Sequence, residues 1–330
     1  VQKSTFTTLT KGYFFEKRKD SRTYMKSQVK ADLTLLLVTM LWGISYLLTD
    51  FVLEELDPFN INALRFIIAF LVAVLLTGKR LRPTNVITLK YAALLGAILM
   101  VVYLGSTFGV KYTSLSNAGF LCALTVVITP VMGFFFKGQR AEKKLIISVV
   151  FALAGIAFLT LNESLRPALG DILCILCAVA YAVHLLVTES AVMKEGVIVY
   201  QLGVYQLGFC GIYQLFLSAV FESPALPSSG KVWVSILVLA VFCTGFSFVA
   251  QTIAQQYTSA SHVGVIFSLE PVFAALVAFF VAGEVLSPRA YLGAALLLVS
   301  LFIMELDIKK FAGLLWWKIR KRRINLKEPL

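Results

Sequence analysis

Three ionisable residues lie inside long uncharged stretches of this chain and are the first candidates for chemistry: Arg65, Glu270 and His184. A charged side chain in hydrocarbon is costly, so each needs a partner or a polar cavity. Arg65 either forms a structural ion pair with the acidic residues shortly before it or binds a substrate carboxylate. Glu270 either carries a proton that is exchanged for substrate or hydrogen-bonds neighbouring helices. His184 has the same two interpretations.

Neutral residues in these stretches offer hydrogen bonds and large faces to an organic ligand. Amides and aromatic rings can orient a zwitterion, but they also tie helices together. The further candidates for binding are Trp42, Ser45, Tyr46, Tyr103, Asn117, Tyr181, Gln206 and Gln251. Pro130 and Pro271 are expected to bend the helices that contain them, because proline frees a backbone carbonyl.

The elements that must position these side chains are membrane-spanning helices. Of the 330 residues, 59% are hydrophobic and only 15% are charged. A helix needs about 20 mostly apolar residues to cross the hydrocarbon core. The sequence therefore predicts an all-α integral membrane fold with ten transmembrane helices, at 33–49, 59–78, 91–110, 112–136, 145–162, 172–188, 196–221, two within 232–269, and 290–304.

Basic residues indicate how the chain is oriented. With a cytoplasmic N-terminus and ten crossings, most Lys and Arg fall on the inner side. The outer side carries only Lys111, Arg166, Lys231 and Arg289. This asymmetry satisfies the positive-inside rule and predicts a multi-pass protein of the plasma membrane with both termini cytoplasmic. The net charge of +12 then indicates contact with anionic membrane lipid rather than with nucleic acid.

Both ends of the chain are rich in basic residues and lie outside the predicted spans. Residues 1–30 form a basic extension without an apolar core, and Met25 is placed as a start codon would be, so residues 1–24 are expected to precede the true start. The tail 309–330 mixes aromatic and basic residues, which is typical of an interfacial helix.

All five cysteines fall inside predicted spans, where they behave as small hydrophobes. Cys174 and Cys177 form a CxxC, but no second Cys or His pair accompanies it, so no metal site and no cofactor is expected.

The chain also repeats itself. An offset of 145 residues aligns 112–139 with 257–284, with ten of the 28 pairs identical, among them a Tyr-Thr-Ser block. An offset of 139 pairs Asp32 with Asp171, Trp42 with Tyr181, Ser45 with His184, Thr49 with Thr188 and Asp50 with Glu189. Two five-helix halves follow, 31–162 and 168–308, and an odd number makes the repeat inverted, the architecture of alternating access. The two Tyr-Thr-Ser blocks are then expected at opposite faces of the membrane, where each could act as a gate.

Several short motifs resemble the EamA-type branch of the drug/metabolite transporter superfamily. They are Leu41-Trp42-Gly43-Ile44-Ser45-Tyr46, Leu64-Arg65-Phe66, Tyr112-Thr113-Ser114, Asn117-Ala118-Gly119, Tyr257-Thr258-Ser259 and Leu269-Glu270-Pro271. The resemblance covers residues 31 to about 306 and implies ten helices with a solute cavity between two inverted halves. Relatives export amino acids and other metabolites. One departure is Gln139-Arg140, where the second half has Gly283-Glu284.

Other functions fit the sequence less well. A membrane enzyme would need a catalytic cluster, whereas the two histidines are far apart and no carboxylates cluster inside the spans. A scaffold or receptor would leave the inverted symmetry unexplained. A phosphorylated substrate would favour several cations, but only Arg65 is available. The sequence thus predicts a gradient-driven exporter of a small neutral or zwitterionic metabolite, first an amino acid and second a hydrophobic drug. Proton coupling is an option, and the oligomeric state stays open.

Overall fold

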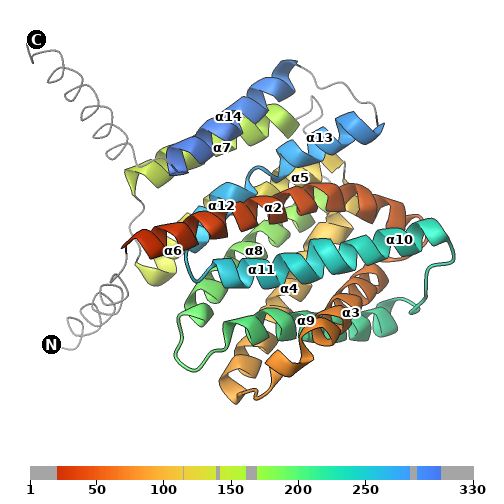
Figure 1. Ribbon diagram of the computed structural model, residues 1–330. Helices are drawn as coiled ribbons and strands as arrows, with labels where there is room; N and C mark the ends of the chain where they lie inside the picture. Colours follow the sequence, from red (N-terminus) through yellow and green to blue (C-terminus); the bar gives the residue numbers. More distant parts are fainter. Residues whose placement is uncertain (1–20, 114, 139–141, 161–168, 283–287, 306–330) are drawn as a thin grey trace, which may run out of the picture.

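The computed structural model describes residues 21–113, 115–138, 142–160, 169–282 and 288–305, and every regular element in these ranges is a helix. In a bilayer each backbone N–H and C=O must be satisfied within the protein, which a helix does within its own segment. The elements pack as one bundle (Figure 1) and are α2 (Ser21–Leu53), α3 (Pro58–Thr77), the short η1 (Gly78–Leu81), α4 (Val86–Tyr112), α5 (Leu115–Ala123), α6 (Thr125–Lys137), α7 (Lys143–Thr160), α8 (Leu169–Val192), α9 (Val199–Phe221), α10 (Gly230–Val238), η2 (Leu239–Phe246), α11 (Ser247–Ala254), α12 (Ala260–Phe267), α13 (Glu270–Ala282) and α14 (Pro288–Glu305).

Six helical stretches are long and apolar enough to cross a membrane. They are Ser27–Leu53, Pro58–Leu81, Val86–Tyr112, Leu169–Val192, Val199–Phe221 and Gly230–Ala254. Each contains or largely overlaps one of the spans expected from the sequence. The prediction of an all-helical, multi-pass membrane protein is therefore confirmed at this level.

The remaining expected spans correspond to shorter helices. The stretch 145–162 lies in α7 as far as residue 160, and 290–304 lies in α14. These two helices lie side by side at one edge of the bundle in Figure 1. Ser148 and Ser300 join them, because each hydroxyl donates to the backbone carbonyl of the other residue at 2.8 Å. Reciprocal bonds of this kind are a common way to hold helices together in lipid.

The expectation of one continuous helix over 112–136 is wrong, because the chain is divided at Leu124 into α5 and α6. A break of the same kind at Ser268 and Leu269 separates α12 from α13. At both breaks the leucine amide donates a hydrogen bond to the carbonyl oxygen of the residue three positions earlier. Leu124 donates to Leu121 at 3.3 Å, and Leu269 donates to Ile266 at 3.2 Å. The breaks are 145 residues apart, so the offset seen in the sequence recurs in the backbone.

The two prolines lie on the C-terminal side of these breaks. Pro271 is in the first turn of α13, where a missing N–H costs nothing, rather than at a bend inside a continuous helix. Pro130 is inside α6. The interruption in the first half therefore precedes Pro130 by six residues instead of occurring at it.

Aromatic rings fill the centre of the bundle, where α2 contacts α11, α12 and α13. The ring centroid of Trp42 lies 4.7 Å from that of Phe267 and 5.5 Å from that of Phe248. The Trp42 indole N–H donates to the Cys243 carbonyl at 2.8 Å. Cys243 belongs to η2, a π-helical insert, and such inserts occur frequently at functional sites.

Some expectations concern parts of the chain outside the described residues. They are the upstream start proposed for residues 1–24, of which 1–20 are not described, the interfacial tail 309–330, and the departure at Gln139-Arg140 with its counterpart Gly283-Glu284.

Candidate functional site

A cavity lies in the centre of the bundle, between residues of α2, α3, α4, α5, α6, α8, α11 and α13. About 70 Å³ is open to the centres of water molecules, which is room for on the order of five waters. The sequence candidates that line it are Arg65, Glu270, Trp42, Ser45, Tyr46, Tyr103 and Tyr181. Residues from both halves of the chain therefore meet at one place.

Arg65 on α3 is 3% exposed and reaches the cavity from one side. Its Nε donates to the Thr244 hydroxyl of η2, and its guanidinium carbon lies 4.7 Å from the centre of the Tyr103 ring. Its Nη2 is buried and has no hydrogen-bond partner. A buried, unsatisfied donor on a fixed cation is costly unless an acceptor arrives, so this atom is placed to bind an anionic group.

The acidic loop before α3 does not supply that group. Asp57 pairs with Lys111 at 2.8 Å, and Glu54 lies 3.8 Å from Lys231. Glu55 accepts hydrogen bonds from the Ser228 and Ser229 amides. Interaction with the Ser229 side chain, together with the bonds from Ser228 and the Ser229 amide, lowers the pKa of Glu55 to about 2. The structural ion pair considered for Arg65 is thus absent among the described residues.

Glu270 is the first residue of α13, immediately after the break, and is half-buried against the cavity. The Tyr46 side chain lines the cavity beside its carboxyl group, and Arg65 acts on that group electrostatically. Thr125 is its counterpart at an offset of 145. Thr125 begins α6 and lines the same cavity. Each broken helix therefore brings the start of its second part to the site, as in transporters whose discontinuous helices end at the substrate.

Aromatic faces form much of the remaining wall. The Tyr103 ring packs edge-on against Phe66 with 4.7 Å between centroids, and Phe248 lies 6.0 Å from Tyr103. Trp42 and Tyr181 meet edge to face at 5.7 Å. Ring faces attract organic cations as well as apolar groups. The wall therefore suits a positively charged or apolar part of a ligand.

Three candidates of the second half lie outside the cavity wall. His184 Nε2 lies 3.0 Å from Gln206 Oε1, and the Gln206 amide donates to Thr252 at 2.9 Å. Gln251 accepts from the Tyr181 hydroxyl at 2.9 Å. This network connects α8, α9 and α11 and holds Tyr181 in place from behind. His184, Gln206 and Gln251 thus support the wall, while Ser45, the counterpart of His184, lines it.

The candidate Asn117 belongs to α5, but its side chain is not among those described.

Several residues that line the cavity were not predicted from the sequence. Thr49, Ser106, Thr107 and Thr125 add hydroxyl groups that single-residue inspection did not select. The offset of 145 from Glu270 would have identified Thr125. Among the described residues, no group of three or more His, Cys, Asp or Glu could hold a metal ion.

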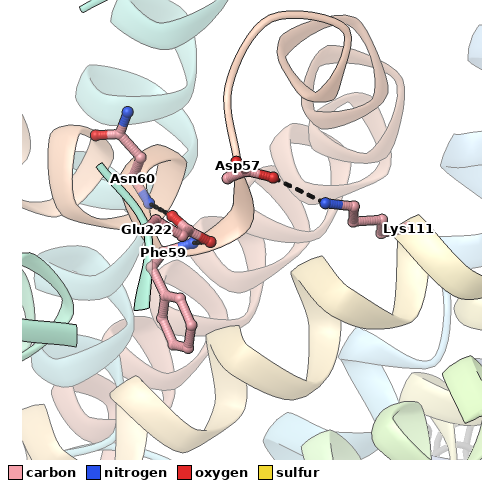
Figure 2. Close-up of polar contacts among 5 residues, drawn as sticks. All are labelled: Asp57, Phe59, Asn60, Lys111 and Glu222. Carbon is pink, nitrogen blue, oxygen red and sulfur yellow. Dashed lines mark hydrogen bonds and ion pairs between the residues drawn. The ribbon is translucent and has the colours of Figure 1, made fainter. Parts of the chain in front are cut away.

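The start of α3, which positions Arg65, is held by a carboxylate from another helix. Glu222, directly after α9, accepts the amides of Phe59 at 3.1 Å and Asn60 at 2.9 Å (Figure 2). These are donors that a helix N-terminus leaves unsatisfied. Partial burial raises the pKa of Glu222, and the two hydrogen bonds oppose that rise. Lys111 and Asp57 pair beside this contact (Figure 2), so the N-terminal end of α3 is firmly attached.

Fold and site together define a class. Apolar helices surround a small cavity that contains a cation with a free donor, a carboxylate and aromatic faces, the arrangement of a membrane solute carrier.

The chain belongs to the EamA-like transporter family, whose model matches residues 29–161 and again residues 168–306. Two Archaeoglobus fulgidus proteins, each named as an uncharacterized transporter, are similar to it. One is 29% identical over 284 residues, with 84% of this chain and 86% of the relative covered. The other is 26% identical over 263 residues, with 77% and 90% covered. The Bacillus subtilis uncharacterized transporter YetK is 22% identical over 302 residues, with 87% and 90% covered.

A solved structure, titled only as the crystal structure of a protein, has the same fold. Its TM-score is 0.71 at 18% identity, over 86% of this chain and 99% of that one. The family resemblance stated from the motifs is therefore confirmed, and the family and the names of the relatives indicate a transporter rather than an enzyme. A transporter of this family acts on a small-molecule substrate.

Proposed function

We propose that this protein is a secondary transporter of the plasma membrane that exports a small zwitterionic metabolite, an amino acid, by alternating access. Ten spans in two inverted five-helix repeats, with both termini cytoplasmic, complete the proposal. The duplicated family match and the paired helix breaks support two related halves. An inverted repeat gives two conformations that expose one site to opposite sides in turn.

The observation that carries the proposal is the free Nη2 of Arg65 opposite Glu270 in one cavity. The carboxylate of an amino acid binds Arg65 and satisfies the unpaired donor. The ammonium group binds Glu270 and the ring faces of Trp42 and Tyr103. Neither charge of such a ligand is then left alone in a site that contains both counter-charges.

The size of the cavity favours an amino acid over a hydrophobic drug as the substrate. A volume that admits on the order of five waters suits a ligand with few heavy atoms. A bulky hydrophobic drug would need several lining rings to move. Hydrophobic drug efflux remains the second candidate, because the aromatic wall would contact such a molecule. A non-transporting receptor or scaffold has no specific observation in its favour.

Glu270 also provides a route to energy coupling. A carboxylate that binds the substrate ammonium must release it when it takes up a proton, so proton and substrate exclude each other at this residue. Such competition at one carboxylate is sufficient for exchange of protons against substrate. We therefore assign proton coupling to Glu270 as part of the proposal.

Counterflow of radiolabelled amino acids into proteoliposomes tests the proposal. Loss of one charge-assisted hydrogen bond weakens binding by about 10- to 150-fold, the equivalent of about 1.5–3 kcal/mol. Arg65→Gln should raise KM by this factor for an amino acid but not for its carboxamide, which lacks the carboxylate. Glu270→Gln should remove acceleration by a pH gradient. Glu54→Gln, a carboxylate at the surface, is the matched control and should behave as the unchanged protein. Absence of uptake for every amino acid would overturn the proposal.

A further inference from the structure

A second cavity, of about 330 Å³, lies between α2 and α11. Ala31 and Thr34 of α2 and Ala250 and Ala254 of α11 line it, together with Tyr257 just beyond α11. These positions are near the beginning of α2. The pair Lys111 and Asp57 shows that α4 ends beside the other end of α2. The second cavity is therefore at the end of the bundle opposite to the end of α4 and the beginning of α8.

The internal repeat relates this cavity to a closed interface. Its lining residues have counterparts, by offsets of 139 and 145, on α8 and α4. The counterparts are Gly170 for Ala31, Leu173 for Thr34, Gly105 for Ala250, Gly109 for Ala254 and Tyr112 for Tyr257.

These counterparts are in direct contact with one another. A Cβ added to Gly105 would lie 2.5 Å from the carbonyl oxygen of Leu173. A Cβ added to Gly170 would lie 2.7 Å from the backbone of Tyr112. No side chain fits between α4 and α8 there, whereas the equivalent space between α2 and α11 is a cavity. The interface between α4 and α8 is closed, whereas its repeat counterpart, in which α2 and α11 are also in contact, contains a cavity.

Polar groups at the two ends show the same difference. The Thr113 hydroxyl donates to Asp171 Oδ1 at 2.6 Å, which joins the end of α4 to α8. The counterparts of these residues are Thr258 and Asp32. Thr258 Oγ1 and Asp32 Oδ1 are both buried without a hydrogen-bond partner, although His262 Nε2 lies 3.3 Å from that aspartate oxygen. The bond made at one end is absent at the other.

We infer that the cavity between α2 and α11 is the mouth through which solute enters the central cavity from the face where α2 begins. It closes when the Thr258 hydroxyl bonds Asp32 and α2 moves against α11, although the methyl groups of Ala31, Ala250 and Ala254 keep these helices farther apart than α4 and α8 are here. The contact between α4 and α8, with its bond from Thr113 to Asp171, opens in exchange. This inference rests on the proposed alternating access, but it needs no particular substrate.

The closed mouth can be trapped by a disulfide. Thr34 and Ala250 are the counterparts of Leu173 and Gly105, which touch, so Thr34→Cys with Ala250→Cys should form a disulfide faster the more the closed form is populated. The full chain is studied in proteoliposomes with a mild oxidant, and each single-cysteine variant reports the background from the five native cysteines. The cross-linked protein should lose counterflow, and reduction should restore it.

Two valine variants in this double-cysteine background should act in opposite directions. Thr258→Val removes the bond of the closed mouth and should slow disulfide formation about threefold to fifteenfold, the effect of one interhelical hydrogen bond. Thr113→Val removes the bond of the present state and should speed it by a similar factor. Thr39→Val is the control, because this buried hydroxyl bonds only Leu35 of its own helix.

The outcomes separate this inference from the proposed substrate. Equal rates in both variants, or changes of the same sign, would overturn the inference even if amino acids are transported. Opposite changes would support it even if no amino acid is carried. If a valine variant fails to fold, labelling of Ala250→Cys alone by a water-soluble maleimide in the unchanged background decides: no reaction would contradict an open mouth.

Discussion

The contact between α4 and α8 makes a quantitative prediction for Gly105→Ala. The added Cβ would lie 2.5 Å from the Leu173 carbonyl oxygen and 2.8 Å from Cys177 Cβ, and ordinary contact begins at 3.4 Å. The two helices must therefore separate by about 0.9 Å, the difference between 3.4 and 2.5 Å. The obstacle is backbone, which cannot rotate aside as a flexible side chain could.

The size of the effect follows from the cost of overpacking. Extra atoms in a packed interior cost about 1–3 kcal/mol, which is a factor of about 5 to 150 in an equilibrium. Only conformations with α4 against α8 bear this cost. The alanine variant should therefore shift the equilibrium by this factor toward conformations in which these two helices are apart.

The reaction of Cys174 with a maleimide measures that shift. Cys174 is fully buried on α8 and lies against Gly109, so it reacts only when α4 moves away. Mass spectrometry of the labelled peptide should show a rate at least severalfold higher for Gly105→Ala. Gly230→Ala is the matched control, because an added Cβ meets nothing within 4 Å there. Equal labelling and equal thermal stability of the two variants would refute the packing argument.

Two further predictions concern other contacts. Ser148→Ala and Ser300→Ala should each lower the free energy of unfolding by about 0.6–1.7 kcal/mol. The double variant should lose less than the sum of the two, because the serines bond each other. Additive losses in a double-mutant cycle would contradict this. The bonds from Ser228 and Ser229 to Glu55 stabilise the loop above pH 4.5 and should be lost as the pH falls toward 2, since folding lowers the pKa of this carboxyl. Amide hydrogen exchange of the two serines should accelerate in that window, and Glu55→Gln should abolish the pH dependence.

Much of the fold followed from composition alone. Apolar runs and their lengths predicted helices that span a membrane, and the charge-free surroundings made Arg65 and Glu270 conspicuous. The structure places these two residues on one cavity. Which of the neutral residues face it could not be predicted, because a helix that is apolar all round gives no periodic signal for its inner face. His184 and Gln206 therefore looked equivalent to Ser45, yet they support the wall from behind.

The helix breaks were the main error of the sequence analysis, and the reason is local. Leu124 and Leu269 are good helix formers, so neither position carries a breaking signal. Proline drew attention to positions 130 and 271, downstream of both interruptions. Only the offset of 145 residues connects the two breaks. A repeat in the sequence indicates that two segments have the same backbone conformation, but it does not indicate which conformation that is.

The glycines of the closed interface have a consequence for the populations of the states in the proposed transport cycle. Gly105, Gly109 and Gly170 let α4 and α8 touch backbone to backbone, while their counterparts across the repeat are Ala250, Ala254 and Ala31. Three methyl groups keep α2 and α11 from approaching as closely, so in the proposed cycle this packing difference favours the state in which α4 meets α8. A difference of about 1.4 kcal/mol populates one state tenfold over the other. Under the proposed alternating access, the empty carrier would then rest with its mouth open to the face where α2 begins, and the return of the unloaded protein to that face would be its downhill step.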